Sequence, residues 1–483
     1  MKFSKYLKRI TLVLMALLML FSVVACGEDT EQPKDTSNAS GIEDEFPDKD
    51  YGGAEFRIMY RWDSHAYNME DVWAEGMSAN LIHNETFKRN KTVEAKYNVV
   101  ITPVQNKSPR DELRKNGMSG EVICEAMADR MYDTFPIISE GLLLPWNDIV
   151  DLSNEWWDQN CVEQLKMGGH NYLMQGNLSP YSTRSYLNFL WYNKTLADNA
   201  NLDDPYDDVK NMTWTFEKMY NMAKAVSDDT NGDGEYKAGD RFGMLTQVPY
   251  RLLTGFGVSF TVMDEDGYPM LKTFDTLMDE KIRKVNDFLN DEQNTISIER
   301  MCEGANTAGF AHIYSYARSK FNDDQLLFLE GGGSFAEEIT SGALRYGVLP
   351  MPLYDTDQTR YYNMVDEYAC AWGIPHLNTE LEMTGMVLEY MAYASSSLED
   401  AVYETTLKTK KMQALEDSEM LDVIFANGMY ELAFVGNVGI RSMLESMVDT
   451  GSISSTYKRN YKTINAEYTK LRAALESLSG SAE

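Results

Sequence analysis

The chain has 483 residues, of which 43% are hydrophobic and 12% are aromatic. Single hydrophobic cores stop growing at roughly 250–300 residues, so this length excludes a one-core protein and predicts two or three compact domains. The 75 acidic and 44 basic residues give a formal net charge of −31, which argues against nucleic-acid binding because phosphate contacts need clustered Lys and Arg.

The first 25 residues have the features of an export signal. Basic residues precede a short apolar stretch over residues 10–24, and small residues stand before Cys26. This pattern resembles a bacterial lipobox, in which the cysteine is acylated and becomes the mature N-terminus. The alternative is a membrane-spanning anchor, which needs about 20 apolar residues. We predict a lipoprotein signal peptide over residues 1–25, lipidation at Cys26, and a protein anchored to the extracellular face of the bacterial cell membrane.

Residues 26–50 are dominated by Asp and Glu and contain almost no bulky apolar side chains. Such a segment buries too little surface to offset the entropy of ordering its backbone. We therefore predict a disordered acidic tether over residues 26–50 and a folded part that begins near Tyr51.

The four cysteines after Cys26 give no clear signal. Cys124, Cys161, Cys302 and Cys370 lack the C-x-x-C spacing of metal ligands. Whether they are buried thiols or include one disulfide stays open, because nothing in the sequence selects a pairing.

A strand, a helix and a second strand open the folded part. Residues 56–62 alternate with a period of two, a helical stretch covers residues 78–96, and residues 99–101 are typical of a strand. This order indicates a βαβ unit and a parallel sheet, whose ligands bind outside the carboxyl ends of the strands. Arg61, Trp62 and Asp63 fall at such an end.

Apolar patterns predict further elements along the chain. Residues 187–193 and 346–352 are typical of strands, the second one ended by prolines. Residues 214–226 predict a helix with one apolar face. Residues 455–478 place apolar side chains at steps of three and four, which predicts an amphipathic closing helix.

Residues 229–240 have the spacing of a calcium-binding loop. Oxygen-bearing side chains stand at loop positions 1, 3, 5 and 12, with glycine at position 6. The predicted ligands are Asp229, Asn231, Asp233, the main-chain carbonyl of Glu235, and Asp240. The alternative is a metal-free surface turn, since Asn-Gly and Asp-Gly form turns on their own. A strand-like pattern follows the loop and favours a structural calcium ion over a calcium switch.

The spacings that catalysis requires are absent from the sequence. It contains no H-E-x-x-H, no G-x-S-x-G, no phosphate-binding P-loop and no G-x-G-x-x-G fingerprint. The glycine run at residues 331–334 is better interpreted as a loop that lets the backbone approach something closely. Two carboxylates would suffice for a glycosidase, and the abundant acidic residues leave that possibility open. We predict that the chain is not an enzyme.

Five stretches occur in an order that resembles a known family. They are residues 191–194 (WYNK), residues 212–217 (MTWTFE) with 223–225 (AKA), the 229–240 loop running into residues 242–243, residues 326–333, and residues 346–352 (YGVLPMP). Together they resemble the extracellular solute-binding proteins of bacterial ABC importers, in the carbohydrate-binding group that includes maltose-binding protein. The family's proline before the Thr-Trp pair is displaced here to Pro205, and no motif of the first lobe can be placed firmly.

The resemblance implies an α/β fold of two lobes joined by hinge strands, with a cleft between the lobes. Crossings are expected near residues 179–185 and 363–374. The implied order is the first part of lobe 1 over residues 51–183, lobe 2 with the calcium-like loop over 184–362, a return to lobe 1 over 363–430, and C-terminal helices over 431–483.

The resemblance also implies a function. The protein would capture a carbohydrate, expected to be an oligosaccharide, and deliver it as a monomer to ABC permease subunits. Sugar clefts combine aromatic platforms with hydrogen-bonding groups. The side chains expected to bind the ligand are Arg61, Trp62, Asp63, Trp157, Ser334, Phe335, Asp366, Tyr368 and Trp372. For each aromatic residue, packing in the core is the alternative.

Two other functions fit the same lipid-anchored chain. One is a glycan-active enzyme or an adhesin on the cell surface. The other is a binding protein for peptides or another small solute. Product formation would identify an enzyme, and a ligand screen would separate sugars from peptides.

Overall fold

The computed structural model describes residues 46–63, 69–246, 248–310, 312–339, 342–436 and 438–479. Two units divide the chain, Met1–Pro47 and Asp48–Glu483, and the second is the subject below. The predicted signal peptide, Cys26 and most of the tether lie outside the described residues. Among the described residues, contacts with the folded part are already made before Tyr51, because Lys49 pairs with Glu382 at 2.6 Å.

The first sheet has the strand order β2-β1-β3-β13-β4. Its strands are β1 (Ala54–Arg61), β2 (Val99–Asn106), β3 (Ala126–Arg130), β4 (Leu143–Leu144) and β13 (Cys370–Pro375). β1 and β2 are parallel and joined by α2 (Leu81–Tyr97), which confirms the predicted βαβ unit. Asn80 begins α2 by accepting hydrogen bonds from the amides of Ile82 and His83. Further helices on this part of the chain are α3 (Pro109–Ser119), α4 (Met131–Ile138), α5 (Gln159–Gln164) and α14 (Leu381–Tyr393).

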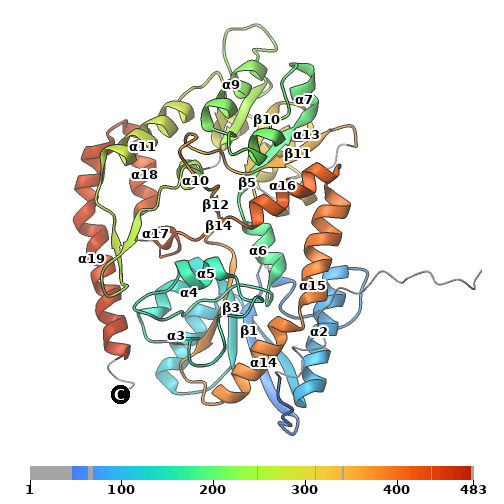
Figure 1. Ribbon diagram of the computed structural model, residues 1–483, viewed down its shortest axis with the longest axis vertical. Coiled ribbons are helices and arrows are strands. Elements are labelled where there is room, and N and C mark those ends of the chain that lie inside the picture. Colours follow the sequence, from blue (N-terminus) through green and yellow to red (C-terminus); the bar gives the residue numbers. More distant parts are fainter. Residues whose placement is uncertain are drawn as a thin grey trace, which may run out of the picture. The chain divides into compact units, whose positions relative to one another are not determined.

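The second sheet has the order β11-β5-β10-β6-β9. Its strands are β5 (Phe189–Asn193), β6 (Phe242–Thr246), β9 (Thr295–Ser297), β10 (Leu326–Gly331) and β11 (Tyr346–Leu349). The strands predicted at 187–193 and 346–352 are thus confirmed in shortened form. α9 (Phe216–Val226) packs on β6 with Phe216, Met219, Ala223 and Val226 buried, which is the apolar face that the sequence predicts. Figure 1 labels β1 and β3 of the first sheet and β5, β10 and β11 of the second.

The remaining elements surround this second sheet or connect it to the first. They are α7 (Lys194–Asn199), α8 (Tyr206–Lys210), α10 (Pro249–Gly255), the hairpin β7 (Thr261–Met263) and β8 (Pro269–Leu271), α11 (Thr276–Leu289), α12 (Ile298–Cys302), α13 (Ile313–Asn322), η3 (Gly333–Glu338), α15 (Ser396–Asp400), the π-helix η4 (Ala401–Lys411) and α16 (Leu415–Phe425).

The two sheets are connected by segments that hydrogen-bond to one another. The chain leaves the first sheet through α6 (Pro180–Tyr186) and returns through β12 (Asn363–Met364), which pairs with β14 (Gly428–Met429). Leu187 forms a bridge with Val365, and the Asp366 amide donates to the Tyr186 carbonyl at 2.9 Å. These connecting segments are the ones that the sequence predicts as crossings.

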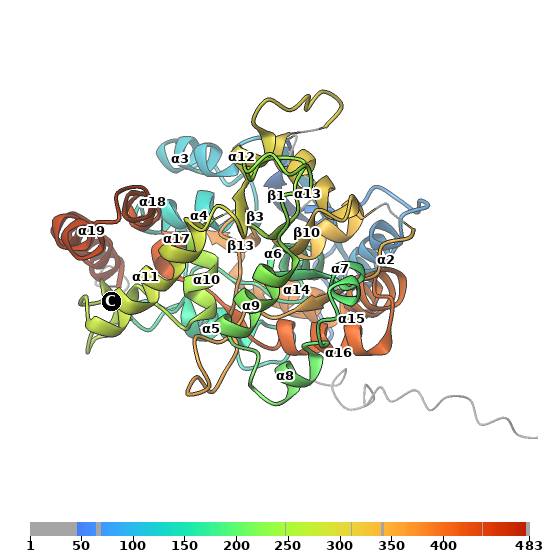
Figure 2. The ribbon, with the colours of Figure 1, turned by 90° about the horizontal axis from the view of Figure 1, so that it is seen from above.

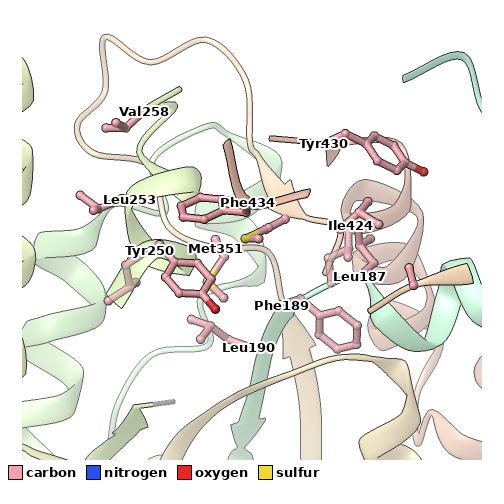
Figure 3. Packing of buried hydrophobic residues seen from close by; sticks show 14 of the residues in the cluster. Leu187, Phe189, Leu190, Tyr250, Leu253, Val258, Met351, Ile424, Tyr430 and Phe434 are labelled. Atoms are coloured by element: carbon pink, nitrogen blue, oxygen red, sulfur yellow. The ribbon is translucent and has the colours of Figure 1, made fainter. Parts of the chain in front are cut away.

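A hydrophobic core runs through the second sheet and the connecting segments. In Figure 3, Leu187 and Phe189 lie beside Ile424, and Tyr250 lies beside Phe434. The Tyr250 and Phe434 rings stack with centroids 4.4 Å apart. Cys124, Cys161, Cys302 and Cys370 are free thiols, three of them buried, so the alternative without a disulfide holds.

The chain closes with α17 (Leu432–Val435), α18 (Ile440–Thr450) and α19 (Ile453–Ser479). Figures 1 and 2 show α18 and α19 side by side. α19 confirms the predicted closing helix, and its Ile464, Tyr468 and Leu475 are buried. It packs against β8 and α11. Within the described ranges, no helix combines the length and the apolar character needed to cross a membrane.

Candidate ligand-binding site

A cavity of about 370 Å³ lies where the connecting segments meet the carboxyl end of β10, and we call it the crossing cavity. Its lining comes from α6 and the residues after it, from α10, from α13 and the residue before it, from β10 with η3, and from the returning segment. The lining residues are Tyr181, Ser185, Tyr186, Asn188, Arg251, His312, Arg318, Gly331, Gly332, Ser334, Glu337, Glu338 and Asp366. Ligands of α/β sheets bind at such strand ends.

Glycines allow the backbone to close this cavity. A Cβ atom added to Gly332 would lie 2.1 Å from the Ser185 carbonyl oxygen, and one added to Gly333 would lie 2.5 Å from that of Arg184. The end of β10 therefore packs directly on the backbone of α6. This close approach is the one that the sequence predicts for residues 331–334.

Arg251 ties three parts of the fold together beside the cavity. Its guanidinium binds Glu330 of β10 at 2.7 Å and Asp366 of the returning segment at 2.8 Å. All three residues are buried, with at most 9% of their surface exposed. Burial raises the pKa of Glu330 to about 7, although the Arg251 charge opposes this shift.

The other charged groups of the cavity also have ionic partners. Arg318 binds Glu338 at 2.7 Å, and Glu337 lies 3.3 Å from the ammonium of Lys411. Each arginine that lines the cavity is therefore matched by a carboxylate. This arrangement offers hydrogen-bond donors and acceptors without an unmatched positive charge that would select an anion.

Tyr181 and Tyr186 give the cavity its aromatic rings. Burial raises the pKa of Tyr181 above its ordinary value, with Glu70 and Glu337 adding to the shift, so the phenol stays neutral. A neutral phenol presents an apolar ring and a hydroxyl that can donate or accept a hydrogen bond.

The structure brings only some of the predicted contact residues to this cavity. Asp366 and Ser334 line it. Tyr368 lies two residues from Asp366 and stacks on Tyr132, with centroids 5.7 Å apart; it does not line the cavity. Tyr132 itself is joined to the returning segment, because its amide donates to the Glu367 carbonyl at 2.9 Å.

Three aromatic residues predicted as platforms have packing roles instead. Trp157, Phe335 and Trp372 are 1%, 1% and 0% exposed. Trp157 packs on Trp146, Phe335 packs edge-on against Trp191, and the Trp372 indole donates to the hydroxyl of Ser179. Their rings are covered by the core, so they present no free face to a ligand.

The residues at the end of β1 separate into two roles. Arg61 is 5% exposed and binds Asp129 at 2.5 Å and Asp133 at 3.0 Å, so it holds the first sheet's carboxyl edge together. Trp62 and Asp63 line a second cavity, of about 720 Å³. We call this the strand-end cavity.

Sequence reasoning missed Arg251, Arg318, Tyr181, Tyr186 and Asn188. The two tyrosines and Asn188 lie in or directly after the predicted crossing at 179–185. Their closeness to the predicted hinge could therefore have identified them. Arg251 follows a strand of the second sheet, and the strand-end rule could have selected it. Arg318 lies within α13 and had no comparable signal.

The calcium-like loop is folded by its own hydrogen bonds. Asp229 accepts from the amides of Gly232 and Gly234 at 2.8 and 2.7 Å, and Asp240, which is 1% exposed, accepts from Thr230. The ammonium of Lys237 lies 2.6 Å from Asp233. Within the described part of the chain, no group of three His, Cys, Asp or Glu residues is gathered so as to hold a metal. These contacts do not supply a calcium cage, and the calcium ion stays a prediction.

A chelator distinguishes the two interpretations of this loop. If a bound calcium ion stabilises the loop, EDTA lowers the melting temperature, because a ligand of the native state stabilises that state by mass action. Asp233→Ala is then expected to remove the effect of EDTA on the melting temperature. The measurement is a thermal melt with EDTA and with added Ca²⁺. Asp266→Ala, on another exposed turn, serves as the control. Identical melting curves with and without EDTA would contradict the prediction.

Solved structures of other proteins share the fold of this chain. No family model and no curated protein matches the chain. Among solved structures, the maltose-binding periplasmic protein MalE of Listeria monocytogenes, in complex with maltose, has a TM-score of 0.55 at 14% identity over 88% of this chain and 99% of its own. An ABC substrate-binding protein of the same organism, in complex with cycloalternan, has a TM-score of 0.53 at 14% identity over 86% and 99%.

A third structure, UspC of M. tuberculosis, has a TM-score of 0.55 at 12% identity over 85% of this chain and all of its own. At sequence identities this low, the structural similarity shows a shared fold. The chain therefore has the mixed α/β, two-lobed fold of periplasmic binding proteins, which confirms the predicted fold class.

Proposed function

We propose that this chain is the substrate-binding lipoprotein of an ABC importer, which captures an uncharged carbohydrate outside the cell membrane and delivers it to permease subunits. The observation that carries the proposal is the crossing cavity, which lies where the connecting segments meet the second sheet of a binding-protein fold and is lined by groups that suit hydroxyls. Two solved structures of this fold hold maltose and cycloalternan. Lipidation at Cys26 and action as a monomer belong to the same proposal.

The chemistry of the lining favours a neutral ligand. Guanidinium, carboxylate and amide groups donate to and accept from sugar hydroxyls, and each hydrogen bond to a charged group contributes about 1.5–3 kcal/mol. Because Arg251 and Arg318 already have carboxylate partners, an anionic ligand would have to displace them. The rings of Tyr181 and Tyr186 can contact the apolar faces of a sugar.

The position of the cavity also suits a binding and release cycle. Its groups come from α6, from the second sheet and from the returning segment, so one ligand contacts the elements on which hinge motion would depend. A ligand that bridges these elements stabilises the arrangement that holds them together. A permease would then distinguish the ligand-loaded protein from the empty one.

A ligand screen tests the proposal. Neutral oligosaccharides are expected to raise the melting temperature and to bind with a measurable Kd, whereas Arg318→Met is expected to weaken binding by about tenfold or more, since it removes a charged hydrogen-bond donor. Arg283→Met is the matched control, because Arg283 is 53% exposed on α11 and pairs with Asp279. Calorimetry provides the Kd values.

Two results would contradict the proposal. Stabilisation by peptides and by no saccharide would identify a binding protein of another class. Conversion of a glycan to products, with loss of rate in Glu337→Gln or Glu338→Gln, would identify an enzyme, because these two carboxylates line the same cavity.

A further inference from the structure

The helix α6, which leads out of the first sheet, does not cap its own first turn. Its N-cap residue is Ser179, whose side chain makes no capping hydrogen bond. The Ser179 hydroxyl accepts from the Trp372 indole instead. Pro180 occupies the first helical position and has no N–H. The amides after Pro180 still need an acceptor, because the first turn of a helix offers them no partner within the helix.

Asp71 supplies that acceptor from a distant part of the sequence. Its carboxylate accepts from the Tyr181 amide at 2.7 Å, although the two residues are 110 positions apart. Asp71 is 0% exposed, so water does not compete for this hydrogen bond. An ionised carboxylate also binds a backbone amide more strongly than a neutral acceptor does. Asp71 is therefore a cap for α6 that comes from outside the helix.

Arg89 of α2 fastens the segment that carries Asp71 to the start of α6. Its guanidinium donates to the carbonyls of Asp71 and Val72 at 2.9 and 3.0 Å. It also donates to the Leu178 carbonyl at 3.0 Å, two residues before α6 begins. Arg89 is 2% exposed, so one buried cation joins the two backbone segments. We call Asp71 and Arg89 the α6 cap pair.

The position of α6 determines the shape of the crossing cavity. Tyr181, Ser185 and Tyr186 of this helix all line the cavity. At its last turn α6 meets β10, since a Cβ atom on Gly332 would lie 2.1 Å from the Ser185 carbonyl oxygen. At its first turn it is held by the α6 cap pair. A shift of the helix at either end would therefore move side chains that line the cavity.

We propose that Asp71 is a positioning residue for the ligand site, because its ionised carboxylate holds the first turn of α6, and with it the two tyrosines of the crossing cavity, in the place that binds the ligand. This inference rests on the proposed function. Asp71 is not among the residues that line the crossing cavity. It therefore acts through α6 and not by touching the ligand.

The charge of Asp71 makes this role depend on pH. Burial raises the pKa of Asp71 to about 7, although the Arg89 charge and the Tyr181 amide oppose this shift. Besides Arg89 of α2, the titratable groups that face Asp71 are Tyr181 on α6 and Cys370 on β13. Burial raises the pKa of both, so they stay neutral. Protonation of Asp71 replaces a charge-assisted hydrogen bond to α6 by a neutral one, which is roughly half as strong.

Stability and ligand affinity are expected to respond to this ionisation in opposite directions. The native pKa of Asp71 is higher than that of an unfolded aspartate, so its contribution to stability is complete at low pH and is lost as the pH rises through the native value. The same ionisation strengthens the cap on α6 and therefore ligand binding. A residue that acted only through overall stability would make affinity and stability change together.

Asp71→Asn tests the inference, because asparagine keeps an oxygen acceptor for the Tyr181 amide and removes the charge. In the native protein, the affinity for maltotriose is expected to rise about threefold to tenfold between pH 5.5 and pH 8.5, the difference between a neutral and a charge-assisted hydrogen bond. In Asp71→Asn the affinity is expected to stay near the native value at pH 5.5 throughout. Calorimetry at temperatures where both proteins are fully folded measures these affinities.

Hydrogen exchange gives a second readout that needs no ligand. The protection of the amides of residues 180–186, corrected for the intrinsic pH dependence of exchange, is expected to rise with pH in the native protein and to stay low in Asp71→Asn. Asp417→Asn is the matched control. Asp417 is also 0% exposed, accepts from the Ala414 amide at 2.8 Å at the start of α16 and binds Lys194 at 2.7 Å. This variant is expected to lose stability and to keep the native pH profile of affinity, because Asp417 caps a different helix.

The outcomes separate this inference from the proposed function. A native affinity that does not change with pH would overturn the inference and leave sugar binding intact. So would an affinity that rises as steeply in Asp71→Asn, which would assign the titration to Glu330, whose pKa is also raised to about 7. Binding of no saccharide at any pH would overturn the proposed function. The exchange of residues 180–186 would then still decide whether Asp71 holds α6, and equal protection in the native protein and Asp71→Asn would show that it does not.

Discussion

Arg251→Met is expected to lower the free energy of unfolding by about 3–5 kcal/mol, which is the range for breaking a buried ion pair from one side. The substitution keeps the length of the side chain but removes the guanidinium that binds Glu330 and Asp366 at 2.7 and 2.8 Å. Glu330 is 0% and Asp366 8% exposed, so both carboxylates stay buried without this cation. Urea unfolding followed by circular dichroism measures the loss.

The pH dependence of that loss identifies its cause. The pKa of Glu330 is already raised to about 7 in the native protein, and removing Arg251 raises it further, because the positive charge opposes the shift. A carboxyl with a raised native pKa gives the fold a stabilisation that is complete below its unfolded-state pKa and is lost as the pH rises from there through the native pKa. The variant is therefore expected to lose less stability at pH 5 than at pH 8. Arg283→Met, which removes an exposed ion pair with Asp279, is expected to leave the free energy of unfolding unchanged. Equal losses at both pH values would contradict the electrostatic explanation.

Local patterns predicted the fold where short-range periodicity decides structure. The period of two at residues 56–62 and the helix at 78–96 gave β1, α2 and the parallel β2, and the apolar steps in α9 and α19 matched their buried faces. These elements bury one stripe or one face of their own sequence, so the pattern is visible locally. The predicted boundaries of the strands were less accurate. Residues 187–188 lie outside β5 because they pair with the returning segment instead. Residues 350–352 lie outside β11 because Pro350 and Pro352 have no amide N–H, and the Met351 amide donates to the Asn363 side chain at 3.0 Å.

The candidate site was less predictable because its contacts join residues far apart in sequence. Glu330 and Asp366 are 79 and 115 residues from Arg251 in the sequence. No sequence spacing predicts ion pairs between residues so far apart. Two tryptophans of the first sheet show the same limit. Trp62 directly follows β1 and Trp372 lies within β13, yet Trp62 is 50% exposed and Trp372 is 0% exposed. Neighbouring helices and loops decide which face is covered. A single sequence does not contain that information in any local pattern.

Gly332→Ala is expected to destabilise the protein by about 1–3 kcal/mol, the usual range for overpacking, and to weaken ligand binding. Its Cβ would lie 2.1 Å from the Ser185 carbonyl oxygen and 3.3 Å from that of Leu187. Both are backbone atoms of the segment that connects the two sheets, so the clash cannot be relieved by a side-chain rotation. The φ of Gly332 is −88°, which any residue adopts, so the effect is steric. Thermal melts and saccharide Kd values measure the two effects.

Gly342→Ala is the matched control, because a Cβ at that position meets no atom within 4 Å and should leave both stability and binding as they are. Gly332 and Ser185 also line the crossing cavity, so separating β10 from α6 enlarges the site as well as loosening the connection between the sheets. Loss of binding is therefore expected even at temperatures where the variant is fully folded. A variant that melts and binds like the native protein would show that the connecting segment moves aside freely, and the crossing cavity would then not be held in shape by this backbone contact.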